Sequence, residues 1–257
     1  MSEAVRAEWT KLRTVASSAW LLLAIVALTV LASGITSDVV KCPASCSADP
    51  VRLSLAGVML GQLGVIGLAV LVVTGEYSTG MITVTLTATP RRSVMLAAKA
   101  AVVAAAVVAA GTVAVLGSLL AGRLLLPGNG FTARRGFAAL SLLHGGTLRA
   151  AAGSVLYLVL IGLFSLGAAT TLRDSAAATA VVLGIVYGIP LIGDVTLSRV
   201  WQHRIERWTP MDAGLAIQAT RNVGTMPIGP WPGLGVLALW GAAAMLAGWL
   251  VLRLRDA

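Results

Sequence analysis

Six apolar stretches, each about as long as a bilayer is thick, constrain this chain more than any other feature of its sequence. An α-helix rises about 1.5 Å per residue, so about 20 mostly apolar residues cross the hydrocarbon core. Hydrophobic residues make up 58% of the 257 residues and charged residues only 11%, against roughly 25% charged in soluble domains. We therefore predict an all-α, polytopic membrane protein, a single transmembrane domain over residues 1–257. Its six transmembrane helices are expected at about residues 19–35, 53–74, 96–126, 150–172, 175–193 and 231–252.

The first 18 residues predict an amphipathic helix rather than a signal peptide. Charges continue as far as Arg13, and no small-residue cleavage site follows a short apolar core. Val5, Trp9 and Leu12 recur at four- and three-residue steps, which places them on one helical face. We expect this N-terminal helix to lie along the headgroups with its apolar face toward the lipid. A disordered charged tail is the alternative.

The long loop before the last span, residues 194–230, predicts short interfacial or re-entrant helices at the outer surface. A stripe of apolar residues at helical spacing ends at Pro210, which cannot continue a helix. Residues 212–220 are expected to form a second short helix. Tryptophan favours headgroup depth, so this region is expected at the membrane surface. The stripe consists of Leu197, Trp201, Ile205 and Trp208.

The distribution of charges fits a membrane protein but does not show on which side of the membrane the termini lie. The net charge is +9, yet the arginines are scattered among loops with no basic patch interleaved with aromatic residues, so a nucleic-acid partner is not predicted. Six spans place both termini on one side. Lysine and arginine number about nine on that side and about ten on the other, so the positive-inside rule decides nothing.

The chain lacks the residues that would supply energy or catalysis. A P-loop needs a glycine directly before its lysine, and Lys11, Lys41 and Lys99 all lack one. All ten acidic residues lie in loops or at the ends of spans, whereas ion-coupled carriers need ionisable groups at depth. We predict that the chain is not an enzyme and binds no cofactor or metal. The energy for any uphill transport would come from another polypeptide.

Two cysteines, Cys42 and Cys46, lie in the sequence CPASC between the first two spans. On the outer side of a membrane they would form a disulfide. Two free thiols are the alternative. A metal site is a weaker one, because two thiols without a nearby histidine supply too few ligands.

The polar interval between the second and third apolar stretches, residues 75–99, has an unusual sequence, GEYSTGMITVTLTATPRRSVMLAAK. In order and spacing it resembles the first cytoplasmic loop of the membrane subunit of type 2 ATP-binding-cassette (ABC) exporters. The N-terminal EWTKLRT and the run Val155 to Leu172 are similar to actinobacterial members of this family. The matching positions are Glu76, Tyr77, Gly80, Pro90, Arg91, Arg92 and Lys99 in the loop, and Trp9 and Leu12 on the N-terminal helix.

This resemblance implies a permease subunit that works with a separate ABC ATPase. The loop would be the ATPase contact, and the N-terminal helix a gate beside it. Two ATPase copies would hold ATP and Mg²⁺, and a second copy of this permease, or a related one, would complete the pathway. Both termini would be cytoplasmic, in a bacterial cell membrane. The implied function is export of a lipophilic or amphipathic substrate, such as a drug, an antibiotic or a lipid-like molecule.

Simpler interpretations of the same residues stay open. Glu76 would then be a solvated carboxylate at the membrane surface, and Arg91, Arg92 and Lys99 would be headgroup anchors. Gln62, in the second span, is expected to bond to a neighbouring helix. Other functions are a non-transporting membrane protein, either an ATPase-linked signal transmitter or an assembly scaffold, and a secondary carrier.

Overall fold

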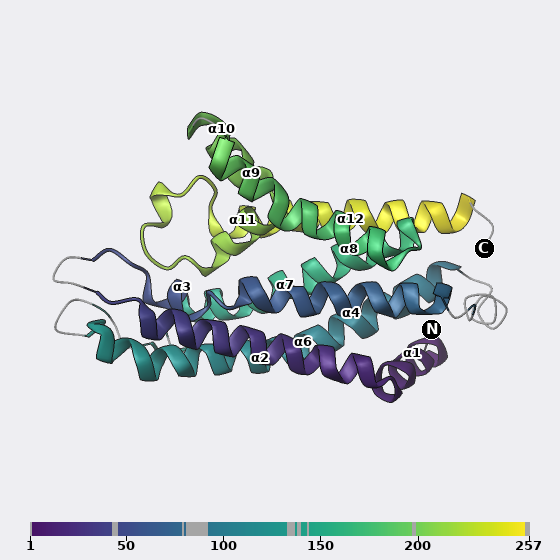
Figure 1. Cartoon of the computed structure of the whole chain (residues 1–257), viewed down its shortest axis with the longest axis horizontal. Helices are drawn as coiled ribbons and strands as arrows, with labels where there is room; N and C mark the ends of the chain where they lie inside the picture. Colours follow the sequence, from purple (N-terminus) through teal and green to yellow (C-terminus); the bar gives the residue numbers. More distant parts are fainter. Residues whose placement is uncertain are drawn as a thin grey trace.

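The computed structural model describes residues 2–42, 46–78, 80, 92–132, 137, 140–142, 144–196 and 199–254 (Figure 1). All regular secondary structure in these residues is helical. Within them, six helical stretches are long and apolar enough to cross a membrane, which confirms the predicted all-α structure with six candidate spans and fits a multi-pass membrane protein. The stretches are Ala16–Val39, Val58–Tyr77, Arg92–Asn129, Gly145–Leu172, Ser175–Gly193 and Pro230–Leu254.

Both ends of the chain lie at the same end of the helical bundle, which we call the terminal end (Figure 1). The spans are formed by α2 (Ala16–Val39), α4 (Val58–Ser78), α6 (Arg92–Leu125) with η1 (Leu126–Asn129), α7 (Gly145–Leu172), α8 (Ser175–Leu183) with the π-helical turn η3 (Gly184–Gly188) and α9 (Ile189–Thr196), and α12 (Pro230–Leu254). The shorter helices are α1 (Ser2–Thr14), α3 (Pro50–Ser54), α10 (Arg199–Trp208), α11 (Pro210–Leu215), η4 (Ala216–Gln218) and η5 (Val223–Thr225).

Helix α7 is the centre of the bundle. It packs against α4, α6, α8 and α12, and its Tyr157, Leu158 and Ile161 are fully buried. Helix α2, by contrast, packs on α4 and α6 and leaves large apolar side chains such as Trp20 and Leu31 exposed. In a membrane such side chains face lipid rather than water, so their exposure fits the spanning assignment.

The second span begins later than the apolar run predicts, because the chain breaks where it meets α2. Asp49 caps α3 by accepting hydrogen bonds from two backbone N–H groups, and α4 starts only at Val58. Between them, Gly57 lies directly on α2: a methyl group added there would stand 2.0 Å from the carbonyl oxygen of Thr29. The N–H of Gly57 also donates to Ser33 Oγ at 3.0 Å. Only glycine permits this contact.

The segment after α10 enters the bundle and packs against α7 and α12. Helix α10 ends at Trp208 and Pro210 opens α11, in agreement with the predicted stop at this proline. Ala213 and Ile217 are then fully buried. Close backbone approach makes this possible: a methyl group added at Gly233 of α12 would stand 1.9 Å from the carbonyl oxygen of Ala213. We call α11 and η4 together the inserted segment.

Candidate functional site: a buried charge cluster at the terminal end

Helix α1 is held against the ends of two spans. Val15 has extended backbone angles, so the chain bends between α1 and α2, and α1 packs against α6 as well as α2. Leu12 is buried and Val5 packs on the same core, as the predicted apolar stripe requires. Trp9, the third residue of that stripe, is instead exposed, and Glu8 takes the buried position. Residues 5, 8 and 12 follow the same three- and four-residue spacing.

Lys99 is the centre of a cluster of charged side chains. It lies two turns into α6 and its side chain is only 2% exposed. Its ammonium group donates to Glu8 Oε2 at 2.9 Å, to Glu76 Oε1 at 2.7 Å and to the carbonyl oxygen of Val72 at 3.3 Å. All three N–H donors of the lysine are therefore used. The alternative that Lys99 anchors to headgroups is wrong.

Lys11 of α1 closes the cluster on its more exposed side. Its ammonium group lies 3.0 Å from Glu8 Oε1 and 2.7 Å from Glu76 Oε1. Partial burial lowers the pKa of Lys11, but the hydrogen bonds and charges of Glu76 and Glu8 raise it by more, so the pKa lies above the ordinary lysine value. Two carboxylates and two ammonium groups make the cluster neutral overall. We call these four residues the charge cluster.

The cluster also settles the environment of Glu76. Its side chain is 9% exposed, so it is not the solvated surface carboxylate of the alternative interpretation. One oxygen, Oε1, accepts from both lysines, whereas Oε2 is buried and has no hydrogen-bond partner among the described residues. A buried network of this kind is weak evidence for stability by itself, because apolar residues often replace it at no cost. Its physical effect is to fix one arrangement of α1, α4 and α6.

Tyr77 and Arg92, two further residues predicted from the sequence, connect the same end of the bundle to the ends of α7 and α12. The guanidinium of Arg173, in the tight turn between α7 and α8, lies 5.5 Å from the centre of the Tyr77 ring, within the range of a cation–π contact. Arg173 adopts a left-handed backbone with φ of 61° as it ends α7. Arg92, at the start of α6, donates to the carbonyl oxygen of Leu252 near the end of α12. This places a positive charge at the negative end of that helix dipole.

The remaining predicted positions are distributed as follows. Gly80 is exposed just after α4 and has a φ of 69°, a conformation that glycine adopts without strain. Pro90 and Arg91 lie outside the described residues. Cys42 and Cys46 form a disulfide in the loop that follows α2, away from the charge cluster. The described part of the chain thus brings Glu76, Lys99 and Leu12 together and leaves the disulfide at the opposite end.

Sequence reasoning missed two of the four cluster residues, Glu8 and Lys11. Both lie within the predicted N-terminal helix but outside its predicted stripe of Val5, Trp9 and Leu12. One signal was available: Glu8 stands between Val5 and Leu12 on the buried stripe and three residues before Lys11, a spacing at which helical side chains meet. An acid on an apolar stripe needs a partner when buried.

No protein-family model matches this chain, and no curated protein matches it significantly. The charge cluster is therefore interpreted from its own geometry. It joins α1 to the last turn of α4 and the first turns of α6, and these two helices flank residues 79–91. The buried Lys99 therefore contacts both α1, through Glu8, and the end of α4, through Glu76.

Proposed function

We propose that this chain is the membrane-spanning subunit of an ATP-driven exporter, with a separate ABC ATPase as its source of energy. The observation that carries the proposal is the burial of Lys99 between Glu8 of α1 and Glu76 of α4. It supports a mechanism in which force on residues 79–91 reaches the N-terminal helix. The resemblance of residues 75–99 to the ATPase-contacting loop of type 2 exporters supplies the identity of the partner.

The proposed mechanism depends on the charge cluster that joins α1 to α4 and α6. ATP binding brings two ATPase subunits together, and their movement displaces the ends of α4 and α6 through residues 79–91. The charge cluster carries this displacement to α1. Buried, paired charges resist partial separation, because an isolated buried charge costs several kcal/mol. The linked elements therefore move together, as a switch between two states of the bundle requires.

The placement in the membrane completes the proposal. Both termini and the charge cluster face the cytoplasm of a bacterial cell, and α1 lies at the headgroups on that side. The inserted segment is a re-entrant element that enters from the outer side. Two such chains, or this chain and a related permease, enclose a pathway for a lipophilic or amphipathic substrate, because six spans are too few to form one alone.

The experiment distinguishes binding of the ATPase from coupling between substrate and ATP turnover. The chain is co-expressed with the ATPase encoded beside its gene and purified in mild detergent. Arg91→Ala, within the proposed ATPase contact at residues 79–91, is expected to reduce recovery of the ATPase severalfold. Lys99→Met combined with Glu76→Gln keeps the cluster neutral and is expected to retain the ATPase but to lose coupling between substrate and ATP turnover. Arg13→Ala, an exposed arginine of α1, is the matched control. Failure of any ATPase to copurify with the unmodified chain would refute the proposal.

A secondary carrier is a second candidate, and Glu76 is the observation that favours it. Its Oε2 is buried and has no partner among the described residues, which leaves one oxygen of this carboxylate open to a coupling proton. Transport into vesicles decides between the two. Transport that stops on ATP depletion supports the exporter. Transport that survives ATP depletion and collapses with the proton gradient supports the carrier, and Glu76→Gln then abolishes it.

A further inference from the structure

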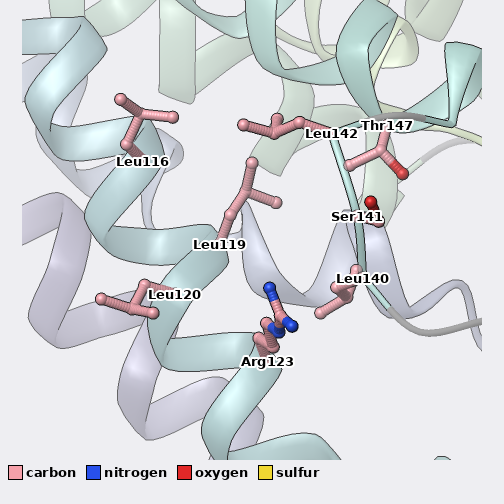
Figure 2. Close-up of a pocket in the computed structure, with 8 residues that line it drawn as sticks. All are labelled: Leu116, Leu119, Leu120, Arg123, Leu140, Ser141, Leu142 and Thr147. Carbon is pink, nitrogen blue, oxygen red and sulfur yellow. The ribbon is translucent and has the colours of Figure 1, made fainter.

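At the end of the bundle opposite the charge cluster, a cavity of about 330 Å³ opens beside α6 (Figure 2). This volume falls within the range of small-molecule sites, roughly 300 to 1,000 Å³. Five leucines supply most of its lining, and three polar side chains complete it. The lining residues are Leu116, Leu119, Leu120, Arg123, Leu140, Ser141, Leu142 and Thr147.

The wall that α6 contributes is graded from apolar to charged. Leu116, Leu119 and Leu120 are followed by Arg123 at the three- and four-residue spacing of one helical face. Arg123 lies two residues before the end of α6, so in a membrane its guanidinium reaches headgroup depth while the leucines stay at hydrocarbon depth. Figure 2 shows the guanidinium between α6 and the Leu140 side of the cavity.

Arg123 is exposed and forms no hydrogen bond or ion pair with any residue in the described part of the chain, although leucines line the cavity beside it. It also lines a second cavity of about 220 Å³, which shares Leu140 with the first. A guanidinium between two largely apolar cavities offers five N–H donors and one positive charge to an anion. Planar, bidentate binding of a phosphate group is the interaction that arginine makes best.

We propose that this cavity binds an anionic phospholipid, with the phosphate on Arg123 and an acyl chain against the leucines of α6. The leucines of the cavity match an acyl chain. The positive charge of Arg123, which lies at headgroup depth and has no partner among the described residues, matches the phosphate. We define the cavity and Arg123 together as the lipid site. It requires neither an ATPase nor transport, so it does not depend on the exporter proposal.

The test is native mass spectrometry of the full-length chain in mild detergent, titrated with phosphatidylglycerol or with phosphatidylcholine of the same acyl chains. The unmodified chain is expected to bind phosphatidylglycerol about tenfold more tightly. Arg123→Gln is expected to abolish this preference. Arg52→Gln removes an exposed arginine of α3 that lines neither cavity, and is expected to keep it. Leu119→Trp fills the cavity without changing charge and is expected to weaken both lipids.

Three outcomes would overturn the proposal. If Arg123→Gln retains the preference, the phosphate binds elsewhere. If Arg52→Gln lowers it as much as Arg123→Gln does, the preference reports net surface charge. If soluble glycerol phosphate displaces the lipid completely, the acyl chain has no place in the site. Because Arg123 makes no described contact that stabilises the fold, Arg123→Gln decides the question even if Leu119→Trp does not fold.

Discussion

Among the elements that do not span the bundle, α1 and the inserted segment are attached to it by opposite means. Helix α1 is held by four charged side chains, and its attachment centres on Lys99. The inserted segment is attached by contacts of a different kind. It is held by close packing on glycines and by neutral hydrogen bonds, such as that from Gln218 Nε2 to Ser154 Oγ at 3.1 Å.

The difference bears on which element is able to move. Close packing of backbone against glycine is lost steeply with distance and has no alternative partner, so the inserted segment has one position. Charged side chains are long and exchange partners, and water solvates them once they are exposed. We therefore predict that α1 is displaced from the bundle more readily than the inserted segment.

The largest expected effect is the loss of a charge from the charge cluster. Lys99→Met leaves two buried carboxylates with only Lys11, and is expected to lower the free energy of unfolding by about 3–5 kcal/mol. Unfolding in detergent measures this. Lys41→Met, the same substitution at an exposed lysine of the opposite end, is the control and is expected to have little effect. Adding Glu8→Gln to Lys99→Met restores neutrality and should recover part of the loss. Equal stability of the two single variants would contradict the assignment.

The next effect tests the packing of the inserted segment. Gly233→Ala places a methyl group 1.9 Å from the carbonyl oxygen of Ala213, and backbone on both sides prevents easy relief. We expect a loss of about 1–3 kcal/mol. Gly235→Ala, two residues along the same helix, meets nothing within 4 Å and is the matched control. Equal effects of the two substitutions would show that helix propensity, and not the contact with Ala213, determines the result.

The spans were predictable from the sequence because bilayer thickness sets their length, and only their limits moved. Helix α2 extends over residues 16–39 instead of 19–35, and Gly57 delays α4 for a reason that lies on another helix. The charge cluster was predictable only in part. Glu76 and Lys99 stood out in a single polar interval, but Glu8 is 91 residues from Lys99, and no local pattern pairs them. Burial of Glu76 depends on α1, so sequence spacing alone could not reveal it.

A smaller effect is expected at the neutral hydrogen bonds that join α4 to α7 beside the inserted segment. The hydroxyl of Tyr157 donates to Gln62 Oε1, and Gln62 Nε2 lies 3.5 Å from the Met211 sulfur. This agrees with the prediction that Gln62 bonds to a neighbouring helix. Gln62→Leu leaves the buried hydroxyl unpaired and is expected to cost about 1 kcal/mol. Tyr157→Phe added to Gln62→Leu removes the unpaired group and should restore stability measured by unfolding. A further loss in the double variant would contradict this account.

The smallest effect, and the one that most directly contrasts the two attachments, is the response of α1 to alkaline pH. The pKa of Lys11 is raised in the folded chain, so its protonated form stabilises the docked α1 fully below the ordinary lysine pKa, and this stabilisation is lost as pH rises through the raised value. Because the side chain is 36% exposed, solvent screens the pair and we expect less than about 1 kcal/mol.

Leu12→Cys, at a buried position of α1, reports undocking through its rate of thiol labelling, whereas Ile217→Cys reports the inserted segment. After correction for thiol ionisation, labelling of the first should rise as the pH exceeds the ordinary lysine pKa of 10.5, and that of the second should not. Lys11→Met should remove the rise. A parallel rise at both positions would mean that the whole bundle opens, and that α1 has no separate attachment.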